Sequence, residues 1–376
     1  MGMSASLRGM RPGGSAARRH AEPGSRGRMG ARVDGLSNTV SVVRMPGKSA
    51  WLVLGLVAAW AVACTPRPAT ALDGSTESYL TSAAAVAPLD LPAGDRLSIV
   101  ATTNILADVV RQVAGQGVEV RSLIPAGVDP HTFEPTPADV RALSEADLIF
   151  INGLGLEAFV ADMLRLAGAA PVIVSASEDI RPLALNEAGH AVETPAAGSP
   201  SGVDPHVWLD PHNVVAWTTT IETALVARDP QHAADYQRGA RAYRAQLQSL
   251  DAELVARLSG IPAGARQMVT DHDEFGYFAR RYGFEIVGAV IPAPSTSAEP
   301  SAQDVARLER AIRELGVRAI FVSTVVNPQL SQRVADDTGI RLVNLHAHSL
   351  TVGGPADTYL DLMRGNAAAI AQALTP

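Results

Sequence analysis

The chain has 376 residues, of which 47% are hydrophobic, enough for two ordinary domains with buried cores and additional segments. Residues 51–376 contain 22 basic and 36 acidic side chains, a formal net charge of −14. Binding to nucleic acid requires clustered positive charge, so this composition excludes nucleic acid as the main partner. The single cysteine, Cys64, excludes an internal disulfide and any zinc site built from several cysteines.

The first 44 residues are rich in Gly, Arg and Ser and lack apolar periodicity, which predicts a disordered leader. The segment that starts at Met45 has the proportions of a signal peptide, which we place at residues 45–63. Our hypothesis is that translation starts at Met45, or at Met29, in which case most or all of the leader is not translated.

An apolar run at residues 51–63 follows Arg44 and Lys48. It is too short for a transmembrane helix, which needs ~20 residues, but it fits the apolar core of a signal peptide. The run ends with small residues before Cys64, as in a lipobox. This predicts lipid attachment at Cys64 and an extracytoplasmic protein held at the membrane by that lipid only. A plain cleavage site or a buried free cysteine is the alternative interpretation.

A segment rich in Pro, Ala, Ser and Thr follows, and we interpret residues 64–96 as the lipidated cysteine and its tether. Order is expected to begin at Leu97. Strand patterns at 97–102, 118–124, 147–152 and 172–175 alternate with helical patterns at 104–114, 137–146 and 156–167. Such alternation indicates a parallel α/β layer, so residues 97–228 are predicted to form an N-terminal lobe.

A polar stretch at 185–202 predicts a mobile surface loop, and helices are expected at 212–228 and 230–258. A second series then follows. Strands are predicted at 267–270, 286–290, 319–322 and 341–345, and helices at 275–282, 302–315, 329–338 and 356–374. The spacing of Ser301 and Asp304 predicts an N-cap. The expected fold is α/β, with two similar parallel-sheet lobes, the second at 259–376, joined by one long rigid helix at 229–258.

The pentapeptide Gly-Val-Asp-Pro-His occurs twice, at 127–131 and at 202–206. Proline fixes its own φ and favours an extended residue before it, so His131 and His206 are presented from stiff loops. A histidine held in this way loses little entropy on binding a metal. The carboxylates available to orient the two rings are those of Asp129, Glu134, Asp204 and Asp210.

Two further histidine sites lie at strand ends in the second lobe. His272 follows one predicted strand, and His346 and His348 follow the last one. Ligands of such sheets bind at the carboxyl ends of strands, so the two lobes are expected to close a cleft around one ion. The remaining histidines after the leader, His190, His212 and His232, are interpreted as solvated side chains, although His212 could support a ligand.

At these residues the chain resembles the zinc- and manganese-binding solute receptors of bacterial ABC importers. The likeness runs from about residue 97 to the C-terminus and rests on residues 101–104, 129–135, 152–157, 204–211, 270–278 and 282–283. It implies two lobes bridged by a long helix with the metal between them. It also implies a membrane permease and an ATPase as partners, and we expect a monomer.

The resemblance assigns His131, His206 and His272 to the first three metal ligands. The fourth ligand of the family is often Asp, and here His348 falls at that place, so His346, water or no ligand remain alternatives. Neighbours that could contact the ligands or replace one are His346, Glu134, Asp210 and Asp271.

Four imidazoles favour Zn²⁺, with Mn²⁺ as the alternative, because nitrogen ligands suit zinc and oxygen ligands suit manganese. Binding requires neutral imidazole, so affinity should fall as the pH approaches ~6. The rival function is a zinc-dependent hydrolase, but the His-Glu-x-x-His and Gly-x-Ser-x-Gly motifs are absent. We therefore expect a receptor and not an enzyme.

Overall fold

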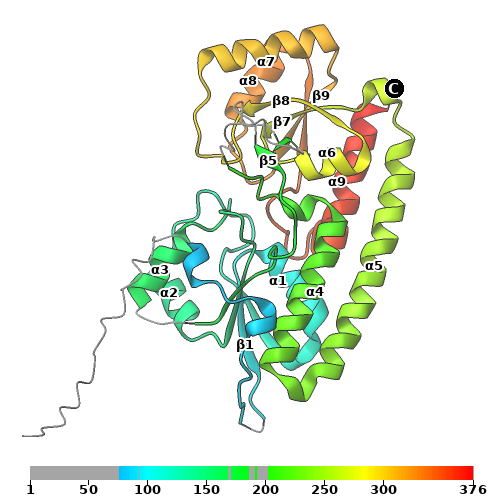
Figure 1. Ribbon diagram of the computed structural model, residues 1–376. Coiled ribbons are helices and arrows are strands. Elements are labelled where there is room, and N and C mark those ends of the chain that lie inside the picture. The colour runs from blue at the N-terminus through cyan, green and yellow to red at the C-terminus, as the bar shows by residue number, and fades with distance from the viewer. Residues whose placement is uncertain (1–75, 93, 168–170, 186–190, 193–201, 376) are drawn as a thin grey trace, which may run out of the picture. The chain divides into compact units, whose positions relative to one another are not determined.

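The computed structural model describes residues 76–92, 94–167, 171–185, 191–192 and 202–375. The predicted leader, the predicted signal peptide and Cys64 lie outside the described residues. The described residues form two α/β lobes within one compact unit of the chain (Figure 1). The predicted fold class is confirmed.

The N-terminal lobe is built on a sheet of four parallel strands in the order β2-β1-β3-β4. Its inner strands are apolar and buried on both faces, as a parallel sheet covered by helices requires. The strands are β1 (Leu97–Ala101), β2 (Val118–Ser122), β3 (Leu148–Ile151) and β4 (Ile173–Ser175), and the helices are α1 (Asn104–Ala114), α2 (Pro137–Ser144) and α3 (Phe159–Ala167).

The C-terminal lobe repeats this topology with a sheet in the order β10-β9-β7-β8, all parallel. In both lobes the first strand lies between the second and the third, so the chain crosses over next to it. Such a crossover leaves a crevice at the carboxyl ends of the strands. The strands are β7 (Gln267–His272), β8 (Glu285–Ile291), β9 (Ala319–Ser323) and β10 (Arg341–Leu345), and the helices are α6 (Gly276–Tyr282), α7 (Ala302–Leu315) and α8 (Gln329–Thr338).

The lobes are joined by α5 (Ala233–Ser259), which runs along both of them (Figure 1). Its 27 residues span ~40 Å. Buried residues recur along it at helical spacing, from Tyr236 through Leu247 to Leu258. This stripe packs against α1, α4 (Pro211–Arg228) and α9 (Tyr359–Leu374), so the linker is part of the core and not a free hinge.

Hydrogen bonds also tie the lobes together beside the linker. The indole of Trp208 donates to the carbonyl of Ala347 at 2.7 Å, and the hydroxyl of Tyr359 donates to the carbonyl of Trp208 at 2.8 Å. All of these groups are buried. Asn104 donates from Nδ2 to Ser349 Oγ and accepts from Leu350 N. These bonds hold the carboxyl end of β10 against the first lobe.

The N-terminal lobe begins earlier than the sequence suggested, which corrects the expectation of a tether up to residue 96. Residues Thr76–Tyr79 and Ala83–Ala85 form short 3-10 helices, and Leu80 forms a parallel bridge with Ile173. Ala83 and Val86 are buried in the core. The Pro-, Ala-, Ser- and Thr-rich composition of this segment indicated a tether, and its short 3-10 helices have no strand or helix periodicity that would have revealed the contacts.

Several element boundaries also differ from prediction. The long helix begins at Ala233, after a 3-10 turn at Pro230–His232, and the final helix begins at Tyr359, capped by Thr358. The part of the stretch 185–202 that the structure describes includes a short antiparallel pair, β5 (Ala184–Leu185) and β6 (Ala191–Val192). The predicted N-cap at Ser301 is confirmed, because Ser301 and Asp304 form a capping box.

Candidate metal centre

Four histidines meet between the lobes. One nitrogen from each of His131, His206, His272 and His348 lies within 4.8 Å of the others. The first two are carried by loops of the N-terminal lobe, His131 after β2 and His206 after β6. The other two lie at the end of β7 and after β10. The Nε2 atoms of His131 and His206 are 3.1 Å apart.

The four rings are arranged as a nearly regular tetrahedron. The six distances between their centroids range from 4.9 to 5.5 Å. A tetrahedral zinc ion with Zn–N bonds of about 2.0–2.1 Å places four imidazole centroids about 5.2 Å apart. A square-planar arrangement would make two of the six distances about 1.4 times longer than the others. The observed spacing fits a tetrahedral cation and not a planar one.

Burial holds three of the four rings, those of His131, His206 and His348, in the neutral form that metal binding needs. His206, His272 and His348 are buried, and His131 is half-buried. Burial and the neighbouring His272 lower the pKa of His131 to about 3. Burial and the other histidines likewise hold the pKa of His206 and that of His348 well below the usual value. The lone pairs of these three rings therefore remain available in the mildly acidic range.

Two of the rings are oriented by buried carboxylates. Asp204 Oδ1 lies 2.8 Å from Nδ1 of His206, and Asp271 Oδ1 lies 2.8 Å from Nδ1 of His272. A carboxylate at Nδ1 places the proton there and leaves Nε2 as the acceptor. His348 Nδ1 is 3.0 Å from the hydroxyl of Ser323, which serves the same purpose.

The repeated pentapeptide has a structural explanation. In each copy the aspartate accepts a bond of 2.9 Å from the backbone N–H of the histidine two residues on. The second oxygen of Asp129 accepts from the Thr296 hydroxyl of the opposite lobe at 2.6 Å. The carbonyl of Asp204 accepts from the Tyr277 hydroxyl, also from the opposite lobe, at 2.9 Å. Each loop is thus fixed by a turn and by the other lobe.

Other residues considered from the sequence are not in the cluster. His346 is half-buried, with Nδ1 3.4 Å from the hydroxyl of Thr324. Glu134 is exposed. Asp210 accepts from the N–H of His212 and caps α4. The structure therefore places His348, and not His346, beside the other three histidines.

Sequence reasoning missed Glu274. This residue is buried between β7 and α6, and its Oε2 lies 3.2 Å from Nε2 of His348. Neither of its carboxylate oxygens has a hydrogen-bond partner. Burial and the carboxylate of Asp271 raise the pKa of Glu274 well above the usual value. Its place two residues after His272 was the available signal, but a carboxylate in a polar string is usually solvated.

The loop after β3 supports the first lobe's side of the centre. Glu157 is buried and accepts from the Thr102 hydroxyl at 2.6 Å and from the backbone of Asn152 and Gly153. Burial raises the pKa of Glu157 to about 7. The amide of Asn152 in turn donates to the carbonyl of Pro205 at 3.1 Å, next to His206. This chain of contacts explains why residues 152–157 matter for a site they do not enter.

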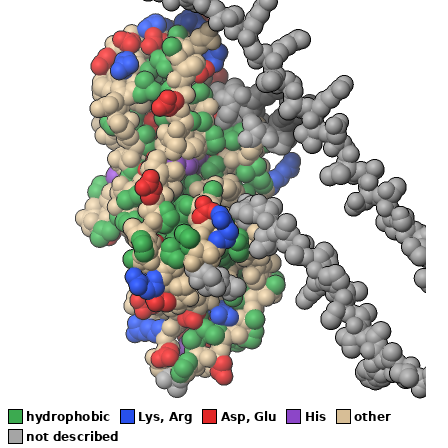
Figure 2. Space-filling model, turned by 90° about the vertical axis from the view of Figure 1, so that its left-hand side faces the viewer, with side chains coloured by type: hydrophobic (Ala, Val, Ile, Leu, Met, Phe, Trp, Pro, Cys, Tyr) green, Lys and Arg blue, Asp and Glu red, His purple; other side chains and the backbone are tan. Residues whose placement is uncertain are grey.

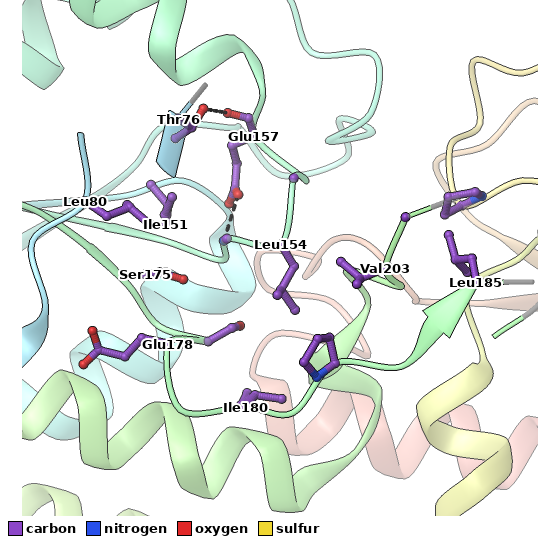
Figure 3. Close-up of a pocket in the computed structure, with 16 residues that line it drawn as sticks. Thr76, Leu80, Ile151, Leu154, Glu157, Ser175, Glu178, Ile180, Leu185 and Val203 are labelled. Carbon is purple, nitrogen blue, oxygen red and sulfur yellow. Dashed lines mark hydrogen bonds between the residues drawn. The ribbon is translucent and has the colours of Figure 1, made fainter. Parts of the chain in front are cut away.

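A cavity of about 640 Å³ lies on the other side of this loop. Figure 3 shows Ile151, Leu154, Ile180 and Val203 around it, with Glu157 at its edge. None of the four clustered histidines is among its lining residues. The cavity is therefore separate from the candidate metal centre.

Little histidine is visible at the outer surface, as expected for a cluster that lies between the lobes. On the face shown in Figure 2, acidic and basic side chains are interspersed and histidine contributes only small areas. Among the residues that the structure describes, no helix has both the length and the apolar character needed to cross a membrane.

Two parallel α/β lobes packed on one long helix, with imidazoles gathered between them, define the class of metal-binding receptors of ABC importers. The chain belongs to the family described as zinc-uptake complex component A, periplasmic, whose model matches residues 99–373. The resemblance to metal-binding solute receptors of ABC importers, which the sequence motifs indicated, is confirmed. Members of this family are substrate-binding components of transporters, so the chain is not an enzyme, and the hydrolase alternative is set aside.

Relatives carry names with different metals. The manganese-binding lipoprotein MntA of Halalkalibacterium halodurans is 33% identical over 73% of this chain and 87% of its own length. The iron ABC transporter substrate-binding lipoprotein MtsA of Streptococcus pyogenes is 29% identical over 74% of this chain and 89% of its own length. The structure of the periplasmic zinc binding protein TroA from Treponema pallidum matches 75% of this chain and all of its own, with a TM-score of 0.68 and 28% identity.

Proposed function

We propose that this protein captures Zn²⁺ outside the cytoplasm through His131, His206, His272 and His348, and delivers it to an ABC importer. The observation that carries the proposal is the near-equality of the six distances between ring centroids, 4.9 to 5.5 Å. Because the relatives are named for manganese, iron and zinc, the metal has to be argued from the site itself.

Zinc is favoured by the donor set. Four neutral imidazoles in a tetrahedron match the preference of Zn²⁺, whereas Mn²⁺ prefers more oxygen ligands and a higher coordination number. The affinity order alone would favour copper, but Cu²⁺ prefers a tetragonal geometry that these rings do not offer. Mn²⁺ remains the second candidate, because Glu274 supplies a carboxylate at the edge of the cluster.

The membrane attachment belongs to the same proposal. Relatives are named lipoproteins, and the motif at Cys64 has small residues before the cysteine and an apolar run before them. In our proposal, the signal peptide spans residues 45–63 and a lipid on Cys64 anchors the protein. The tether is then residues 65–75, since the chain packs on the first lobe from Thr76 onward.

Delivery requires a partner that loosens the site. A permease and an ATPase are the expected partners, and the monomer is the expected binding unit. Two ligands come from each lobe, so a small separation of the lobes removes half of the donors at once. The contacts of Thr296 and Tyr277 across the cleft are the bonds that such a separation would break.

The test is metal stoichiometry in paired variants. His131→Ala together with His206→Ala removes the first lobe's ligands, and we expect it to abolish binding of one zinc ion per chain. His346→Ala, which changes a histidine outside the cluster, is the matched control and should bind as the unchanged protein does. Unchanged zinc binding in the double variant, with the fold verified by circular dichroism, would refute the assignment.

A further inference from the structure

The buried carboxylate of Glu274 has no role in a site made of four imidazoles. Its side chain is 1% exposed, and neither oxygen has a hydrogen-bond partner. Burying a polar group without a partner is costly, so each such group in a folded protein needs an explanation. The Nε2 atoms of His272 and His348 also lack hydrogen-bond partners. These unsatisfied atoms are concentrated at one place.

One cation can contact Glu274 together with the unpartnered histidine nitrogens. Glu274 Oε2 lies 3.2 Å from Nε2 of His348. Two ligand atoms bound to the same first-row metal ion are roughly 3.0–3.4 Å apart. The separation between Glu274 and His348 is therefore that of two ligands, and not of a hydrogen-bonded pair, which the geometry does not form.

The position of Glu274 explains when it would bind. Its carboxylate lies on the C-terminal lobe's side of the cluster, beside the rings of His272 and His348, and it is not one of the four groups that meet within 4.8 Å. A tetrahedral ion is already complete without it. An ion that prefers oxygen and more than four ligands has this carboxylate within reach, since its Oε2 already lies at a ligand–ligand distance from Nε2 of His348.

We propose that Glu274 is a conditional fifth ligand, which joins the four histidines when the site holds Mn²⁺ and stays unbound when it holds Zn²⁺. This inference rests on the proposed function, because it assumes that the four histidines bind the ion. It assigns to Glu274 the ability of this chain to bind Mn²⁺ in addition to Zn²⁺. The histidine that replaces a carboxylate at position 348 would otherwise leave the site with nitrogen donors alone.

The experiment compares Glu274→Gln with the unchanged protein in titrations with Mn²⁺ and with Zn²⁺. Glutamine keeps the shape of the side chain and removes the anionic ligand. We expect Mn²⁺ affinity to fall by about tenfold or more, a loss on the scale of removing a supporting carboxylate from a metal site, and Zn²⁺ affinity to change by less than about threefold. Glu299→Gln, at an exposed position in the segment between β8 and α7, removes the same charge at the surface and should change neither affinity.

A spectroscopic measurement separates ligation from a structural role. The electron paramagnetic resonance spectrum of bound Mn²⁺ depends on the number and kind of its ligands. We expect Glu274→Gln to change the spectrum of the Mn²⁺-loaded protein, and Glu274→Asp, which keeps a shorter carboxylate, to change it less.

The outcomes are distinct. Equal losses of Mn²⁺ and Zn²⁺ affinity in Glu274→Gln, or no loss of either, would overturn the proposal, as would identical spectra of the Mn²⁺-loaded unchanged protein and Glu274→Gln. If the unchanged protein bound neither ion, the proposed function itself would fail. If it bound zinc through the histidines while Glu274→Gln left Mn²⁺ affinity unchanged, only the role of Glu274 would be wrong.

Discussion

The two carboxylates that orient the histidine rings differ in the number of their oxygens that accept hydrogen bonds, and this difference can be tested. Asp204 uses a single oxygen, Oδ1, to accept from both the backbone N–H and Nδ1 of His206, and its Oδ2 has no partner. Asp271 uses Oδ1 in the same way for His272, but its Oδ2 accepts from the N–H of Ser323 at 2.7 Å. Substitution by asparagine should therefore have different consequences at the two positions.

In Asp204→Asn, the amide oxygen can take the place of Oδ1, and the NH₂ group can take the place of Oδ2, which has no partner. Both hydrogen bonds from His206 are then retained, and only the negative charge is lost. A hydrogen bond to a charged group contributes about 1.5–3 kcal/mol and a neutral one about 0.5–1.5 kcal/mol. The difference of about 1–1.5 kcal/mol corresponds to a zinc affinity lower by about five- to tenfold. Burial raises the pKa of Asp204, so removing its charge should not lower the free energy of unfolding of the metal-free protein.

In Asp271→Asn, one of the two positions must carry NH₂ and face a backbone or ring N–H donor. The buried donor left without an acceptor costs about 1–3 kcal/mol. We expect this variant to show a similar loss of zinc affinity and, in addition, a free energy of unfolding that is lower by that amount in the metal-free protein.

The assay pairs a zinc competition titration against a chromophoric chelator with denaturant unfolding in the presence of excess chelator. The difference in stability between the two variants is the decisive quantity. Equal stability of Asp204→Asn and Asp271→Asn, or an unchanged zinc affinity in both, would refute the reasoning.

Three further predictions follow from other contacts. Thr296→Val removes the hydroxyl that donates to Asp129 across the cleft, and we expect zinc dissociation to become about tenfold faster. Stopped-flow mixing with a chelator measures this rate, and an unchanged rate would show that the hydrogen bond does not hold the lobes together around the ion. Between pH 6.5 and 4, acidification should destabilise the metal-free protein more than its His131→Ala variant, because the lowered pKa of His131, about 3, means that the unfolded chain binds that proton first. The variant is the reference because the raised pKa of Glu157 acts in the opposite direction in both proteins. Zinc binding by the unchanged protein should persist below pH 6, and an equal pH dependence of stability in the two proteins would contradict the reasoning about His131. Gly239→Ala places a Cβ 2.3 Å from the carbonyl of Val113, so α5 and α1 must separate, and unfolding should show a loss of about 1–3 kcal/mol with zinc affinity retained; unchanged stability would contradict this.

The pH prediction changes an expectation from the sequence. An ordinary imidazole would lose its metal as the pH approaches ~6. Burial between the lobes holds the pKa of His206 and that of His348 well below that range. The sequence pattern does not show this burial, because it arises when the two lobes pack together. The loss of zinc should therefore occur at a lower pH than the sequence alone suggested.

Much of the fold could be predicted because its signals are local. Alternating apolar strands and helices recur at short spacing, and the capping pair Ser301 and Asp304 marks the start of α7 within four residues. The two Asp-Pro-His loops were informative for the same reason: each turn is closed by its own aspartate, Asp129 or Asp204.

The rest depends on contacts between distant segments. The sequence could not separate His346 from His348, because both follow the same strand and only the packing of the lobes places His348 beside the other rings. It could not identify Glu274 either, since the burial of this carboxylate arises from both sides of the cleft. The early start of the first lobe at Thr76 was missed because the segment forms only short 3-10 helices, and their contacts with Glu157 and with the core leave no strand or helix periodicity in the sequence.

The central claim is that imidazoles from both lobes bind one ion, and X-ray diffraction from crystals of the zinc-loaded protein, recorded at the zinc absorption edge, tests it most directly. The account predicts a single anomalous peak about 2.0–2.1 Å from the Nε2 atoms of His131, His206, His272 and His348. A peak that contacts the histidines of only one lobe, or a zinc ion bound elsewhere with the four rings unoccupied, would contradict it.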